Sequence, residues 1–127
     1  MDMKLELVPV PVTDVDRAKS FYVEQVGFNL DHDHQLSETL RIVQLTPLGS
    51  GCSIVFGTGL PDMYRMQPGS LRGLHLVVAD VSEAREALAG RGVEVSDVVE
   101  QPGGIKYAYF NDPDGNSWAL QQLLTDV

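Results

Sequence analysis

The stretch FNDPDGNSWALQQL, residues 110–123, contains a Pro-Asp-Gly turn between two short runs of strand-forming residues. Proline fixes φ early in a turn and glycine accepts the positive φ that turns often require, so this sequence favours a tight reversal of the chain. The flanking runs, residues 105–110 and 118–123, are rich in the apolar and aromatic residues that strands contain. We therefore predict a β-hairpin at this end of the chain.

A related turn occurs 66 residues earlier in the sequence. At this shift PLG at 47–49 falls on PDG at 113–115, and VTDV at 12–15 falls on VADV at 78–81. Neither alignment needs a gap, so one shift accounts for the start and the end of each copy. Self-similarity at a fixed spacing indicates two copies of one structural unit.

Each copy begins with a strand-like run and continues with a helix. Asp14 and Asp80 are good N-cap residues, because a carboxylate accepts hydrogen bonds from the free amides of a first helical turn. The strand-like runs are residues 5–12, 28–34, 40–45 and 52–56 in the first copy and 74–78, 93–99, 105–110 and 118–123 in the second. The sequence therefore predicts an α+β fold of two tandem βαβββ modules. We expect one domain over residues 1–127, with module 1 at about 4–58 and module 2 at about 70–124.

The composition argues against several classes of function. The 127 residues include 9 Lys or Arg and 18 Asp or Glu, which gives a net charge of -9 at pH 7. Such a chain is repelled by polyanions, so we expect no nucleic-acid partner. The apolar runs are too short to cross a membrane and no signal peptide is evident, so we expect a cytoplasmic protein without a membrane partner. The single cysteine, Cys52, allows no internal disulfide, which fits a reducing compartment.

Three segments together resemble one known family. They are VTDVDRAKSFYVEQVGF at 12–28, LHLVVADVSEAREALAGRGVEV at 74–95 and YFNDPDGNSWALQ at 109–121. They are similar to the vicinal oxygen chelate superfamily, the group of glyoxalases, bleomycin-resistance proteins and extradiol dioxygenases. The resemblance implies two βαβββ modules that form a curved, barrel-like mixed sheet around a cavity. It also implies a homodimer, since relatives often build or complete their cavities across two chains.

Enzymes of this family hold a divalent metal through four ligands, one on the first and one on the last strand of each module. The resemblance places these four positions at Leu7, Ser53, Gly73 and Ala119. Leu, Gly and Ala have no side-chain donor atom, and a serine hydroxyl is a poor metal ligand by itself. We therefore predict no metal and no cofactor in the cavity.

Residues two positions further along each inner strand point to the same side as these vacant positions, because strand side chains alternate between faces. We thus expect Pro9, Val55, His75 and Gln121 to face the cavity. The intervening residues are expected to form the core on the opposite side: Val8, Val10, Ile54, Leu74, Leu76, Trp118 and Leu120.

Polar groups among these residues suggest the chemistry of the cavity. His75 can serve as an acid–base group or be a structural imidazole bonded to a neighbour. Gln121 can orient a carbonyl or hydroxyl of a ligand, or be a structural amide. The resemblance places Tyr107 and Tyr109 on the cavity wall, where aromatic rings with a polar tip suit substrate recognition or plain packing.

Other positions leave more than one interpretation open. The repeat gives Arg41 and Val43 as counterparts of the two tyrosines, and Arg41 either meets an anionic ligand or is an exposed strand arginine. His32 and His34 share one strand face, but two imidazoles without a third ligand favour a polar strand end over a zinc site. The segment 57–70 between the modules is a lid, a dimer contact or a simple linker.

Two functions follow from this pattern. The first is metal-independent binding of a small organic molecule, drug-like or an aromatic metabolite, as the resemblance to bleomycin-resistance proteins implies. The alternative is a metal-free isomerase, cyclase or lyase-type enzyme that uses His75 as its acid–base group. A third possibility, an interaction protein, applies if the cavity is filled by the chain's own side chains.

Overall fold

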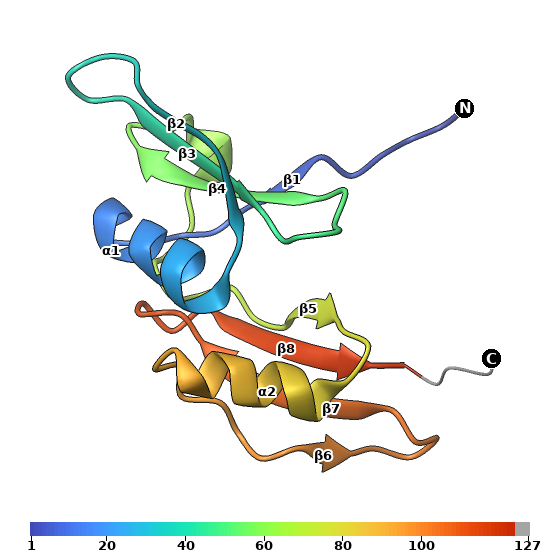
Figure 1. The fold of residues 1–127 in the computed structure, drawn as a ribbon. Coiled ribbons are helices and arrows are strands. Elements are labelled where there is room, and N and C mark those ends of the chain that lie inside the picture. The colour runs from blue at the N-terminus through green and yellow to red at the C-terminus, as the bar shows by residue number, and fades with distance from the viewer. Residues whose placement is uncertain (124–127) are drawn as a thin grey trace.

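The computed structural model describes residues 1–123 and contains two modules with the same order of elements (Figure 1). Module 1 comprises β1 (Leu7–Pro9), α1 (Val15–Ser20), a π-helical segment η1 (Phe21–Val26), β2 (Asn29–Gln35), β3 (Arg41–Thr46) and β4 (Ser53–Thr58). A 3-10 turn η2 (Asp62–Tyr64) lies in the connection. Module 2 comprises β5 (Leu74–Val77), α2 (Val81–Gly90), β6 (Val99–Glu100), β7 (Lys106–Asn111) and β8 (Ser117–Gln122). The predicted tandem βαβββ order is confirmed.

Each module forms a four-stranded mixed sheet, in the orders β1-β4-β3-β2 and β5-β8-β7-β6. The first strand of each module runs parallel to the last, and the remaining pairs are antiparallel. The two sheets of the single chain are not closed around one cavity, whereas the resemblance implied a barrel-like arrangement. Figure 1 shows the reason: α1 lies between the two sheets, and residues of both modules share one hydrophobic core on the helix side.

Alternation along the strands gives each sheet a helix-side face and an opposite face, here called the open face. On the helix side, Ile54, Trp118 and Leu120 are buried in the shared core together with Val10. Leu74 and Leu76 pack against this core, as predicted, whereas Val8 is only half-buried and lies outside it. The open face of module 1 carries Leu7, Pro9, Gln44, Thr46, Ser53 and Val55. The open face of module 2 carries His75, Val77, Tyr107, Tyr109, Ala119 and Gln121.

The helices begin where the sequence predicts. The Asp14 carboxylate accepts from Arg17 N at 3.0 Å, and that of Asp80 accepts from Ser82 N at 2.9 Å. The first helix ends at Gly27, whose φ of 96° favours glycine, but its last six residues are π-helical. The Tyr22 carbonyl accepts from two amides there, and the wider turn accompanies a Tyr22 side chain that is 0% exposed in the shared core.

Two predicted strands are shorter than expected. The first covers Leu7–Pro9 rather than residues 5–12, because Pro9 and Pro11 have no amide to donate to a ladder. In the segment 93–98, Ser96 N donates to Tyr109 O, but the Ser96 carbonyl accepts from Arg85 Nε at 2.6 Å instead of pairing with a strand. Within residues 1–123, no helix is long and apolar enough to span a membrane.

Candidate functional site

Four of the predicted site residues lie together on the open face of module 2. Ala119 of β8 pairs with His75 of β5 on one side and with Tyr109 of β7 on the other. In the next row, Gln121 of β8 lies between Val77 and Tyr107. Three adjacent strands therefore present one imidazole, two phenol rings and one amide on a single surface.

Side-chain contacts link these four residues directly. The Tyr107 ring lies 5.9 Å from the His75 ring at an interplanar angle of 89°, and 6.0 Å from the Tyr109 ring at 7°. Gln121 Nε2 donates to Tyr107 Oη at 3.2 Å. His75 Nδ1 is 2.6 Å from the carbonyl oxygen of Gly73. The cluster, named here the His-Tyr cluster, is held by contacts among its own members and the adjoining backbone.

The His-Tyr cluster is open to solvent in the single chain. His75 is exposed, Tyr109 is 43% exposed and Val77 is 63% exposed. Ala119 is 1% exposed, because neighbouring side chains cover its methyl group. A flat molecule laid on this face would contact the cluster from one side only.

Pro9 and Val55 lie on the open face of module 1 instead. They border a pocket of about 270 Å³ that the connection between the modules also lines, through Tyr64, Arg65 and Met66. Among the described residues, the lining of this pocket includes no member of the His-Tyr cluster. Pro9 and Val55 thus lie in module 1 and the other four residues in module 2, and a cavity lined by all six stays a prediction.

The structure changes one of the four residues that the sequence alignment assigned to the metal positions of the family. Leu7 pairs with Ser53 as expected, but Ala119 pairs with His75 rather than Gly73. The cause is a two-residue difference between the modules, since Pro9 pairs with Val55 whereas Val77 pairs with Gln121. The 66-residue shift aligns the helix caps Asp14 and Asp80. Module 1 has two more residues between its first strand and its cap than module 2, so the same shift misaligns β1 with β5.

With this correction the four positions hold Leu7, Ser53, His75 and Ala119. They offer one imidazole and one hydroxyl, and the Ser53 hydroxyl is already 2.6 Å from Thr46 Oγ1. Such a donor set does not fit a divalent ion, which takes several nitrogen, oxygen or sulfur ligands. In the described part of the chain no three His, Cys, Asp or Glu side chains are grouped to hold a metal.

Arg41 and Val43 are not counterparts of the tyrosines. Tyr107 pairs with Gln121, and the equivalent partner of Val55 in module 1 is Gln44. Val43 is 0% exposed in the core. The hairpin of β3 and β4 is shorter than that of β7 and β8, so the 66-residue shift assigns the wrong residues of β3. Arg41 and Val43 lie on the helix side of the sheet instead.

Arg41 forms an ionic cluster with carboxylates of module 1. Its Nη1 lies 2.8 Å from Asp16 Oδ1, and its Nη2 lies 2.9 Å from Asp33 Oδ2, which Lys19 Nζ also contacts at 2.7 Å. Hydrogen bonds from Arg41 and then Lys19 hold the pKa of Asp33 well below its usual range. The interpretation of Arg41 as an exposed arginine is wrong, since its side chain is only 19% exposed, and a contact with an anionic ligand stays a prediction.

His32 and His34 lie on the same face of β2 with their rings stacked 5.5 Å apart. His32 pairs with Gln44, so both imidazoles are at the edge of the module 1 open face. In the described residues no third metal-ligating side chain joins them. The connection between the modules carries the exposed Met63, and its role as lid, dimer contact or linker stays a prediction.

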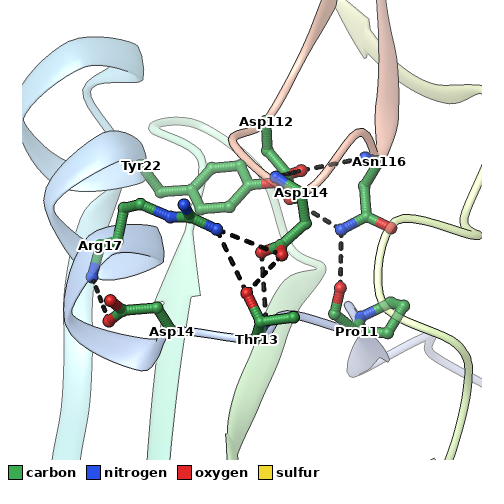
Figure 2. A network of polar contacts seen from close by, with 8 residues as sticks. All are labelled: Pro11, Thr13, Asp14, Arg17, Tyr22, Asp112, Asp114 and Asn116. Atoms are coloured by element: carbon green, nitrogen blue, oxygen red, sulfur yellow. Dashed lines mark hydrogen bonds and ion pairs between the residues drawn. The ribbon is translucent and has the colours of Figure 1, made fainter.

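A buried polar network that the sequence did not indicate joins the two modules (Figure 2). Tyr22 Oη donates to Asp112 Oδ2 at 2.8 Å and accepts from Trp118 Nε1 at 2.9 Å. Asn116 Nδ2 donates to the Pro11 carbonyl at 2.8 Å. Burial, and then the Asp112 carboxylate, raise the pKa of Tyr22. The turn alone explains an Asp at position 112. No pattern in the sequence therefore indicated that Asp112 also has a partner in module 1, Tyr22.

Known proteins resemble this chain over nearly its whole length. TnmS3, an antibiotic binding protein from Streptomyces sp. CB03234, is 41% identical, with 97% of this chain and 98% of that chain covered and a TM-score of 0.82. A glyoxalase/bleomycin resistance protein from the same organism is 43% identical over 94% of this chain and 100% of that chain, with a TM-score of 0.78. The uncharacterized protein YetH of Bacillus subtilis is 27% identical over 96% of this chain and 100% of its own length.

A family model covers residues 4–120, from three residues before β1 to the middle of β8. The order of elements in the structure and the likeness to solved members agree with that match. This chain belongs to the Glyoxalase/Bleomycin resistance protein/Dioxygenase superfamily.

Proposed function

We propose that this protein binds a small organic molecule with a flat, aromatic body, and that the His-Tyr cluster is the centre of the binding surface. The observation that carries this proposal is the row of two parallel phenol rings beside an imidazole and an amide. Flat rings stack on phenol faces, and the polar tips orient them. The likeness to an antibiotic binding protein supports the same class of ligand.

A second copy of the chain supplies the missing wall in this proposal. Small-molecule sites bury most of the ligand surface, and one open sheet face buries only one side. The open face of module 1 offers apolar side chains, including Pro9 and Val55, beside a pocket of about 270 Å³. We propose a homodimer in which this face of one copy covers the His-Tyr cluster of the other. In an isologous dimer the same contact occurs twice, so both clusters are covered.

Binding in this proposal is independent of metal and cofactor. The support is the donor set of Leu7, Ser53, His75 and Ala119, which does not fit a divalent ion. A cytoplasmic location is part of the proposal, and the free thiol of Cys52 is consistent with it.

Calorimetric titration with a panel of aromatic antibiotics, bleomycin included, tests this function. Tyr107→Ala and Tyr109→Ala should weaken binding about tenfold or more, because each removes a stacking surface. Leu36→Ala is a control, since Leu36 is 61% exposed in the loop after β2 of module 1 and is not a member of the His-Tyr cluster. The proposal fails if no compound of the panel binds, or if EDTA abolishes binding.

Sedimentation analysis tests the dimer, and a monomer at binding concentrations would contradict it.

A second function is favoured by one specific observation. His75 is anchored at Nδ1 by a backbone carbonyl, with its other ring nitrogen on the exposed face, and this arrangement suits a general base. In that case the protein is a metal-free isomerase, cyclase or lyase-type enzyme. Mass spectrometry of each bound compound after incubation separates the two functions. A product that wild type forms and His75→Ala does not form supports catalysis, whereas unchanged compounds support binding alone.

A further inference from the structure

The hydrogen bond of His75 fixes the position of its proton. Nδ1 lies 2.6 Å from the Gly73 carbonyl oxygen, and a carbonyl oxygen can only accept. Nδ1 therefore carries the hydrogen. The acceptor is itself held in place, because Gly73 has a φ of 73° and its amide donates to Ser117 Oγ at 2.8 Å.

A neutral imidazole carries a single N–H, so the Nε2 atom of His75 presents a lone pair. Among residues 1–123, no donor is hydrogen-bonded to this nitrogen. The side chain is exposed on the open face of module 2. The His-Tyr cluster therefore has an unused imidazole acceptor on the open face, where a ligand would bind in the proposed function.

Tyr107 has the opposite character. Its oxygen accepts from Gln121 Nε2 at 3.2 Å, which leaves the phenolic hydrogen free to donate. Its ring meets that of His75 edge to face at 5.9 Å. The cluster thus presents one acceptor and one donor side by side, next to the parallel ring of Tyr109.

We infer that the ligand is a hydroxylated aromatic molecule whose hydroxyl donates a hydrogen bond to Nε2 of His75. This inference rests on the proposed function and selects one class of ligand within it. A phenol places its donor in the plane of the ring, so the same molecule stacks on the tyrosines and reaches the imidazole edge. A methyl ether of the same shape keeps the stacking but covers Nε2 without giving it a partner, which costs about ten- to hundredfold in affinity.

The test is a matched pair of compounds, 2-naphthol and 2-methoxynaphthalene, titrated into the full-length protein. Wild type should bind 2-naphthol about tenfold or more tightly. His75→Phe should bind both compounds with equal affinity, because it keeps a flat ring but has no acceptor. His75→Gln should keep part of the preference, since its amide oxygen accepts in place of the imidazole. Circular dichroism shows whether each variant is folded.

Nitrogen-15 NMR of the His75 ring reads the tautomer without any ligand. The inference requires a hydrogen on Nδ1, and a hydrogen on Nε2 overturns it. Equal affinities of wild type for the two naphthalenes, or a preference that survives in His75→Phe, also overturn it, while the proposed function stands. If neither naphthalene nor any antibiotic of the panel binds, the proposed function fails and this inference fails with it.

Discussion

The two hairpin turns that the 66-residue repeat aligns differ in what they contact. In module 1, Ser50 N donates to the Pro47 carbonyl at 3.0 Å, and Leu48 of this turn is 81% exposed. In module 2, Gly115 N closes the turn on the Asp112 carbonyl at 3.0 Å, and the Asp112 side chain is buried against module 1. Both copies have a similar hairpin, yet only the second has the carboxylates that join the modules.

The open faces show the same asymmetry. Module 2 presents the His-Tyr cluster, whereas the paired positions of module 1 hold Leu7, Pro9 and Val55. A shared backbone plan thus carries different side chains in each copy. The open face of module 1 mixes the apolar Leu7, Pro9 and Val55 with the polar Ser53 and Gln44, whereas that of module 2 has two phenol rings, an imidazole and an amide. Each prediction below changes one side of this difference.

The largest expected effect is that of Asp112→Ala. The carboxylate accepts from Tyr22 Oη, and from the amide and side chain of Asn116, at 2.8 to 2.9 Å. Its loss leaves these buried donors unpaired, so we expect a decrease of about 3 kcal/mol or more in the free energy of unfolding. Thr46→Ala, at the aligned position of module 1, should cost about 1 kcal/mol. Urea unfolding of both variants measures the difference, and equal losses would contradict an asymmetric role of the turns.

Tyr22→Phe removes the module 1 side of the same contact. It leaves Asp112 and Trp118 Nε1 each without one partner, and we expect a loss of about 1 to 3 kcal/mol. The variant should also change the response to alkali. The folded pKa of Tyr22 is raised, so its contribution is complete below the unfolded value of about 10 and is lost as the pH rises further. Urea unfolding from pH 8 to 11 should show a smaller decline in Tyr22→Phe than in wild type.

These contacts mark the limit of what the sequence could predict. The N-caps at Asp14 and Asp80 and the Pro-Gly turns act through nearby backbone, so a local pattern was enough to find them. The place of Tyr22 depends on a π-helical turn and on a partner 90 residues away, and neither leaves a local pattern.

The candidate site was predictable in part for a related reason. Alternation along β5 and β8, which depends only on strand period, predicted His75 and Gln121 on one face, and the resemblance added Tyr107 and Tyr109. In the structure the four residues share one face, and their role in binding stays a prediction. The metal position of the first strand in module 2 was assigned to Gly73 instead of His75, because module 1 has two additional residues before its helix. The open sheets were missed because the arrangement of two modules depends on the core they share.

Asp33→Asn tests the ionic cluster of module 1, in which Arg41 and Lys19 both contact the Asp33 carboxylate. The ion pairs with Arg41 and Lys19 keep the folded pKa of Asp33 below its unfolded value of about 3.9. Their stabilisation is therefore present above that pH and is lost as the pH falls through the folded pKa. We expect wild type to exceed the variant by about 1 to 2 kcal/mol at pH 7, with the gap narrowing below pH 4. A gap independent of pH would show that packing, not charge, is responsible.

The smallest expected effect is that of Leu48→Asp, which copies the Asp114 of module 2 into the turn of module 1. Asp114 matters through its partners, since Thr13 Oγ1 donates to it at 2.6 Å and Arg17 Nη2 lies 3.3 Å away. Leu48 is 81% exposed, and the Arg91 guanidinium that lines the same pocket as Leu48 already donates to the carbonyls of Gln25 and Val26. The new carboxylate should therefore change the free energy of unfolding by no more than about 0.5 kcal/mol. Asp114→Leu, the reverse exchange, should cost about 1 kcal/mol. A contrary result would be that Leu48→Asp stabilises the protein as much as Asp114→Leu destabilises it. In that case the preference of the turn for Asp would account for the whole effect of Asp114, and its contacts with Thr13 and Arg17 would contribute nothing.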